Sequence, residues 1–236
     1  MPVHALGRQI AFPLVEMAEP DGLLAVGGDL SPARLIHAYT LGIFPWYGPG
    51  APILWWSPDP RLVLFPEDLH IPRSLRRVLN SGRFCVTYDT CFDEVIAACA
   101  NTSRRQGPGT WLVPEMQQAY CLLHQAGVAH SVEVWEKNDL VGGLYGLALG
   151  RAFFGESMFH ARANASKVAL VDLIGILRAW KFQLVDCQQT TEHMLRHGAR
   201  EIPRQLFLKL LQQALEEPSL VGPWTDASGG GHPRTR

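Results

Sequence analysis

The sequence predicts an α+β fold: a mixed sheet with helices on its faces in residues 61–222, preceded by a small domain in residues 1–60. Two observations lead to this prediction. Segments that suit antiparallel strands follow one another in the middle of the chain, and a long apolar helix then leads into a further strand. Before residue 60 the texture differs, because prolines, glycines and tryptophans are dense in Phe44–Gly50 and Trp55–Pro60.

The first 60 residues contain one clear helix signal. Ser31 suits the N-cap, Pro32 suits the first helical position, Leu35 begins an apolar face, and Gly42 ends the helix. The many prolines disfavour a sheet core. We therefore expect a small, irregular module with this one short helix.

The rest of the chain reads as alternating strands and helices. The predicted strands are 84–88, 131–136, 140–149, 152–159 and 184–188. The predicted helices are 92–100, 114–123, 165–180, 191–197 and 203–215. The three middle strands form an antiparallel meander, and the last strand pairs parallel through a right-handed crossover. The glycine-rich end, residues 223–236, is expected to be a disordered tail.

Composition limits the class of protein. The chain has 236 residues, of which 47% are hydrophobic and 18% charged, so it can fold around a sizeable core. Its net charge of −1 argues against a blanket nucleic-acid binder but not against a local basic patch. The most apolar run, Leu140–Gly150, is shorter than the roughly 18 residues that a bilayer needs. With no visible signal peptide and no C-x-x-C pair among the cysteines, we expect a cytoplasmic protein.

Three catalytic or binding motifs are incomplete or lie in the wrong place. Gly155–Phe159 begins like the serine nucleophile elbow but has Phe in place of the second glycine. His193 and His197 follow a glutamate in an order that differs from H-E-x-x-H, so we expect no metal site. Arg104–Gly109 is similar to the pyrophosphate loop of acetyl-CoA-dependent acetyltransferases, but it lies between two helices and not after the third meander strand.

Two acidic residues lie in strands that are otherwise apolar. Glu156 is in one, and Asp186 is in another with Gln188 two positions later, on the same face if the strand alternates regularly. A buried carboxylate needs a partner because its desolvation is costly. Either it forms a structural ion pair, with Lys167 or an arginine, or it belongs to a cleft that holds a cation or moves a proton.

A basic stretch precedes the first predicted strand of the larger domain. Its arginines, together with two in the later loop, are Arg73, Arg76, Arg77, Arg83, Arg104 and Arg105. They form either a solvated helix face or an anchor for a polyanion that contacts phosphates and not bases.

Four longer motifs carry a family resemblance. They are Asp21–Ser31, Gly42–Tyr47 with Trp55–Arg61, Gly155–Phe159 and Asp186–Gln188. From about residue 10 to about residue 215 the chain resembles the bacterial leucyl/phenylalanyl-tRNA–protein transferases. The resemblance implies a catalytic domain similar to the GCN5-related N-acetyltransferases after a small N-terminal α/β domain. It also implies transfer of Leu, Phe or Met from aminoacyl-tRNA to proteins with N-terminal Arg or Lys, which marks them for N-end rule degradation.

The same resemblance implies roles for individual residues. Asp186 would polarise Gln188, which would orient the attacking amine, and Glu156 would hold the acceptor's positive charge or its amine. Residues implied to stack on the terminal adenosine are Trp46, Trp111, Tyr39 and Tyr120, with core packing as the favoured alternative for the two tyrosines. Residues implied to line an apolar pocket for the donor side chain are Leu144, Phe153, Met158 and Leu170. The activated ester needs no metal and no cofactor.

Two other functions stay open at this point. One is a coenzyme A-dependent N-acyltransferase on the same fold, and the other is a non-catalytic adaptor that binds RNA or a peptide. Whichever function holds, we expect a monomer.

Overall fold

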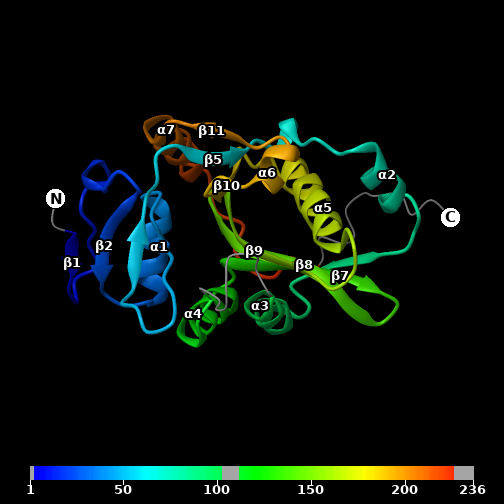
Figure 1. The fold of residues 1–236 in the computed structure, drawn as a ribbon, viewed down its shortest axis with the longest axis horizontal. Helices are drawn as coiled ribbons and strands as arrows, with labels where there is room; N and C mark the ends of the chain where they lie inside the picture. The colour runs from blue at the N-terminus through cyan, green and yellow to red at the C-terminus, as the bar shows by residue number, and fades with distance from the viewer. Residues whose placement is uncertain (1–2, 103–111, 226–236) are drawn as a thin grey trace.

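The computed structural model describes residues 3–102 and 112–225 of the chain. Its strands form two sheets, a small one from the N-terminal part and a larger one that begins at residue 61 (Figure 1). The larger sheet is mixed and carries helices on both faces, so the predicted α+β class is confirmed. The division into domains at residue 60 stays a prediction.

The small sheet corrects the expectation of an irregular module. Its four strands, in the order β1-β2-β4-β3, are β1 (His4–Leu6), β2 (Leu23–Gly27), β4 (Leu54–Trp56) and β3 (Phe44–Pro45). β1 and β2 pair parallel, and the other pairs are antiparallel. The prolines did not prevent this sheet, because Pro45 lies in an edge strand, where its missing N–H is tolerated.

The predicted N-terminal helix is confirmed as α1 (Pro32–Thr40), which follows the short helix η1 (Val15–Met17). The side chain of Ser31 accepts a hydrogen bond from the backbone N–H of Arg34 at 3.4 Å, as expected of an N-cap. The apolar face of α1 buries Tyr39 completely. This face contacts the helix α4 (Pro114–Gln125), which packs against the larger sheet.

The larger sheet has seven strands in the order β11-β5-β10-β9-β8-β7-β6. Their bounds are β5 (Arg61–Leu64), β6 (Cys85–Tyr88), β7 (Ala129–Glu136), β8 (Asp139–Leu149), β9 (Ala152–His160), β10 (Leu184–Gln188) and β11 (Arg200–Ile202). The predicted meander β7-β8-β9 and the parallel pairing of β10 with β9 are both present. β5 and β11 were not predicted, because β5 is buried throughout and β11 is too short to show alternation.

Helices cover both faces of this sheet. Besides α4 they are η2 (Pro66–Asp68), α2 (Arg73–Leu79), α3 (Phe92–Asn101), α5 (Ala165–Ala179), α6 (Glu192–Arg196) and α7 (Arg204–Leu215). α5 lies on one face, and α3 and α4 lie on the other (Figure 1). Two buried apolar clusters result, one shared with α1, α3, α4 and α7 and the other with α2 and α5. Within the described parts of the chain, no helix combines the length and apolarity that a membrane crossing requires.

The C-terminal end also differs from the prediction. A disordered tail was expected from residue 223, but Trp224 is only 5% exposed and belongs to the apolar cluster beneath α5. The glycine-rich composition that suggested disorder begins just after it. Residues 226–236 lie outside the described part of the chain.

Candidate active site

Glu156 occupies an irregular position in the middle of β9. Ser157 pairs with Tyr145 of β8, and Gly155 pairs with the next residue, Gly146, so Glu156 is an extra residue without a partner on β8. Such a bulge redirects a side chain and is common beside active sites. Gly155, Glu156, Ser157 and Met158 are all half-buried, whereas the residues before them in β9 are buried.

Three side chains from different elements donate hydrogen bonds to the carboxylate of Glu156. Tyr39 of α1 donates to Oε1 at 2.7 Å and Tyr120 of α4 donates to Oε2 at 2.8 Å. Gln188 of β10 donates from Nε2 to Oε1 at 2.7 Å. The two tyrosine hydroxyls are themselves 2.7 Å apart. Glu156 is therefore held by the N-terminal module, by α4 and by the neighbouring strand together.

The surroundings of Glu156 change its acidity. Burial raises the pKa of its carboxyl group to about 7, and the hydrogen bonds from Tyr39 and Tyr120 oppose this rise. The charge of Asp186 acts in the same direction as burial, and the value of about 7 is the balance of all these effects. A carboxyl group with a pKa near 7 can accept and release a proton at neutral pH, as a general base must.

Gln188 lies where β9 and β10 stop pairing. The last paired residues are Phe154 of β9 and Asp186 of β10. A bulge then follows on β10, and Gln188 adopts a left-handed backbone with φ of +62°. Its backbone N–H donates to Oδ1 of Asp186 at 2.9 Å, which stabilises this turn. The side chain of Gln188 is thereby directed to Glu156, which regular alternation along β10 would not ensure.

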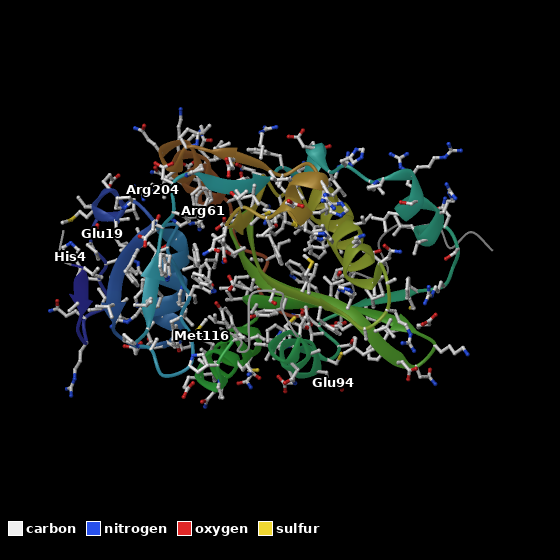
Figure 2. All side chains as sticks on the ribbon, in the orientation of Figure 1. His4, Glu19, Arg61, Glu94, Met116 and Arg204 are labelled. Atoms are coloured by element: carbon white, nitrogen blue, oxygen red, sulfur yellow. The ribbon has the colours of Figure 1, made fainter. Side chains whose placement is uncertain are left out.

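Asp186 forms a buried ion pair with Arg61 of β5. The guanidinium donates through Nε at 2.8 Å and through Nη2 at 2.6 Å, and both side chains are fully buried. Arg61, at the start of β5, is labelled in Figure 2. Arg61 also lies against the rings of Phe44 and Phe207, at 4.8 and 4.6 Å from their centroids. Of the two alternatives for this carboxylate, an ion pair with an arginine is therefore found.

This geometry corrects one predicted detail. Asp186 does not polarise the side-chain amide of Gln188, because that amide donates to Glu156 and only the backbone N–H of Gln188 reaches Asp186. Asp186 is instead bonded to the backbone N–H of Gln188.

The aromatic residues predicted to stack on adenosine separate into two groups. The rings of Tyr39 and Tyr120 are fully buried, so neither offers a face to a base, and the alternative of core packing holds for both. Trp46 is 36% exposed and packs edge-on against Trp56. Trp111 lies outside the described residues, as do Arg104 and Arg105.

A cavity of about 850 Å³ lies between the loop that follows Trp46 and the helix α4. One wall is residues 47–53, directly after Trp46. The opposite wall is the start of α4, including Val113 and Glu115. The cavity therefore lies at the same junction, between the N-terminal module and α4, that brings Tyr39 to Tyr120.

The four residues predicted for the donor pocket lie on the other face of the sheet. Leu144, Phe153 and Leu170 are buried in the cluster beneath α5, and Met158 is half-buried at its edge. Glu156, in contrast, is bonded to Tyr39 and Tyr120, which belong to the opposite cluster.

Four arginines of the predicted basic patch lie in the described part of the chain. Arg73, Arg76 and Arg77 are exposed on α2, at the far end of the molecule from the N-terminal module (Figure 1). Arg83 is exposed too, but it forms an ion pair with Glu136 at 2.6 Å.

Sequence reasoning missed Arg61 as a site residue. The signal was present, since an arginine inside the run Arg61–Leu64 of otherwise apolar residues needs a buried acid. It also missed that the hydroxyls of Tyr39 and Tyr120 donate to Glu156, which sequence spacing does not reveal.

Known proteins of one family match this chain over nearly its whole length. Residues 63–212 match the family model described as leucyl/phenylalanyl-tRNA protein transferase, and residues 28–59 match that of its N-terminal domain. A leucyl/phenylalanyl-tRNA–protein transferase of Desulfatibacillum aliphaticivorans is 56% identical over 98% of this chain and 99% of its own. One of Nitratidesulfovibrio vulgaris strain DP4 is 60% identical over 90% and 91%.

Solved structures are more distant. A GCN5-related N-acetyltransferase from Kribbella flavida is 10% identical, with a TM-score of 0.33, over 74% of this chain and 61% of its own. A conserved protein of unknown function from Staphylococcus epidermidis is also 10% identical, with a TM-score of 0.43, over 77% and 68%.

Proposed function

The chain belongs to the leucyl/phenylalanyl-tRNA protein transferase family, and we propose that Glu156 is the general base of the transfer that it catalyses. The enzyme moves an aminoacyl group from aminoacyl-tRNA to the N-terminal residue of a protein. The donor is an ester and the product is an amide. The ester is already activated, so the enzyme contributes mainly alignment, desolvation and proton transfer.

The proposed step balances around one carbonyl carbon. The neutral α-amine of the acceptor attacks the ester carbonyl, so a C–N bond forms and the bond to the ribose oxygen breaks. Glu156 takes a proton from the amine nitrogen as it becomes positive. The ribose oxygen leaves with a proton, and the carboxylate of Glu156 is restored. The residue thus acts first as base and then as the source of the proton for the leaving group.

The observation that carries this role is the triangle of Tyr39, Tyr120 and Glu156. The triangle has three O···O contacts, of 2.7, 2.7 and 2.8 Å, and each can hold one proton. While Glu156 is ionised, only the two tyrosine hydroxyl protons are available, so one contact has no proton. When Glu156 gains a proton, each contact has one proton and the ring of hydrogen bonds is complete. A proton taken from the amine is therefore accommodated without any movement of side chains.

Gln188 orients the amine beside Glu156. Its Nε2 group donates to Glu156, which leaves the amide carbonyl oxygen as an acceptor for another N–H of the same amine. Asp186 and Arg61 hold Gln188 in place from behind. Gln188 is thus proposed to touch the substrate, and Asp186 to position Gln188.

The donor is proposed to bind across the end of the β9–β10 pairing. Its aminoacyl side chain passes toward Met158 and the apolar residues Leu144, Phe153 and Leu170, as Leu, Phe or Met would. Its terminal adenosine lies at Trp46, beside the cavity at the start of α4. Phosphates further along the tRNA contact Arg73, Arg76 and Arg77.

The acceptor is proposed to be a protein with Arg or Lys at its N-terminus. Its α-amine lies at Glu156, a half-buried residue whose neighbours Gly155, Ser157 and Met158 are half-buried too. We also propose that the enzyme works as a monomer in the cytoplasm and marks proteins for N-end rule degradation.

One assay tests the proposal. Radiolabelled Leu on tRNA is offered to a peptide beginning with Arg and to the same peptide with an acetylated N-terminus. Product is expected only from the free amine, and Glu156→Gln should lose most of it while Glu133→Gln, the matched change at a buried carboxylate elsewhere in the sheet, should not. Equal turnover by wild type and Glu156→Gln would exclude the general base. Transfer of an acetyl group from acetyl-CoA, with no transfer from charged tRNA, would show that the enzyme is instead a coenzyme A-dependent N-acyltransferase.

A further inference from the structure

The last described segment of the chain, residues 218–225, runs past the end of the larger sheet where the β8–β9 turn and the loop before β7 lie; we call it the C-terminal strap. Several hydrogen bonds attach it to the rest of the domain. Ser219 Oγ accepts from the backbone N–H of Gly150 at 2.8 Å, and Arg151 donates to the carbonyl of Pro218 at 2.8 Å. Gly222 donates to the carbonyl of Gly127 at 3.1 Å. The approach is so close that a Cβ on Gly127 would lie 2.4 Å from the nitrogen of Gly222.

The strap ends by inserting the indole ring of Trp224 into the core. The ring stacks on His130, with centroids 3.7 Å apart and planes 8° from parallel. Trp180 meets it edge-on at 4.9 Å. Asp89 fixes both partners of the stack, because it accepts from the backbone N–H of Trp224 at 2.7 Å and contacts Nδ1 of His130 at 2.8 Å. Trp224 is therefore held rigidly in one position.

Trp224 also lies behind Phe153. The two ring centroids are 6.1 Å apart and the planes are tilted by 39°. On another side the ring of Phe153 rests against Gly146, where a Cβ would come within 2.6 Å of it. The strap and the backbone of β8 together leave Phe153 little freedom to move.

We propose that Trp224 is a positioning residue that limits the depth of the donor side-chain pocket by holding Phe153 forward. This inference rests on the proposed donor pocket, in which Phe153 is one of the walls. Removal of the indole would leave a void behind Phe153, so its ring would retreat and the pocket would lengthen. A longer pocket favours the larger donor side chain, Phe, over Leu.

The test compares kcat/KM for Phe-tRNA and Leu-tRNA, with a peptide beginning with Arg as acceptor. In Trp224→Ala the Phe/Leu ratio is expected to rise about tenfold, within the roughly 10–200-fold that one methylene makes in a hydrophobic pocket. Trp224→Phe should largely restore the wild-type ratio. The matched control is Phe182→Ala, a buried ring 6.3 Å from Trp224, which should lose stability but keep the ratio within about twofold.

Each outcome of this comparison supports or overturns the proposal. An unchanged ratio in folded Trp224→Ala overturns it, as does the same change in Phe182→Ala. If Trp224→Ala does not fold, Trp224→Leu and Trp224→Phe are compared, and the ratio must shift more for Leu. Phe153→Ala separates the two levels: if it leaves the ratio unchanged, the donor pocket itself is wrong and this inference falls with it. If Phe153→Ala changes the ratio and the Trp224 variants do not, only the role of the strap is wrong.

Discussion

The hydroxyl groups of Tyr39 and Tyr120 lie 2.7 Å apart, and each also contacts a different oxygen of Glu156. Tyr39 belongs to α1 and Tyr120 to α4, and the two residues are 81 positions apart in sequence. The carboxylate proposed as the base is therefore held by the N-terminal module as well as by the larger sheet. The module thus contributes directly to the proposed reaction centre.

The first prediction concerns the pH dependence of the transfer. Below pH 7 both Glu156, with a pKa of about 7, and the acceptor's α-amine become protonated and inactive. In a plot against pH, the logarithm of kcat/KM of the wild type should therefore fall toward acidic pH with a slope approaching two. Glu156→Gln should lose about 10²–10⁴-fold at pH 7.5 and keep a slope of one. Steady-state transfer between pH 5.5 and 8.5 measures this, and a slope of two in the variant would exclude Glu156.

The second prediction concerns the two tyrosines. Their hydrogen bonds lower the pKa of Glu156, so Tyr39→Phe or Tyr120→Phe should raise it and move the acidic limb of kcat/KM to higher pH by about one pH unit. Tyr88→Phe is the matched control, because Tyr88 donates to Asp172 and not to Glu156. If the acidic limb lies at the same pH in all three variants, the two tyrosines only pack in the core and do not set the pKa of Glu156.

The third prediction concerns stability. The pKa of Glu156 is raised above its ordinary value of 4.5, so its stabilising contribution is present below that value and is lost as pH rises through about 7. At pH 8 the ionised group should destabilise the wild type relative to Glu156→Gln by about 1–3 kcal/mol. At pH 4.5 the difference should nearly vanish. Urea unfolding of both proteins at the two pH values measures it, and a difference independent of pH would contradict the raised pKa.

The fourth prediction concerns the buried pair of Arg61 and Asp186. Removing either charge, as in Arg61→Met or Asp186→Asn, should cost about 3–5 kcal/mol, because the remaining charge is left buried without its partner. The double variant should cost less than the sum of the two. Denaturant unfolding checks both statements. If Asp186→Asn kept full stability and lost activity, Asp186 would have the catalytic role predicted from the sequence.

The fifth prediction concerns the basic residues of α2. Reversal of charge at Arg76 and Arg77 should raise KM for aminoacyl-tRNA and reduce its salt dependence by about one in log–log slope for each phosphate that the protein no longer neutralises. Arg8→Glu is the control, since Arg8 is exposed next to β1, at the opposite end of the molecule (Figure 1). Unchanged salt dependence in the Arg76 and Arg77 variant would reduce this surface to a solvated helix face.

The sequence by itself determined much of the fold. Helical periodicity and a good N-cap predicted α1, and tight turns between apolar runs predicted β7, β8 and β9, because these signals are local. β5 and β11 escaped prediction, since three or four residues are too few to show a periodicity of their own. Trp224 escaped for a different reason: it stands just before a glycine-rich tail, and only contacts with distant residues order it.

In the candidate site, too, some features follow from local sequence signals and others only from tertiary contacts. Motifs picked out Glu156, Asp186 and Gln188 from the sequence, because acids in apolar strands are conspicuous. Only the tertiary structure decided what each one touches, since two bulges in neighbouring strands turn Glu156 and Gln188 toward each other. It also decided that Asp186 faces Arg61 and that two buried tyrosines face Glu156. These contacts join residues far apart in the chain, and the burial that shifts the pKa of Glu156 exists only after they have formed.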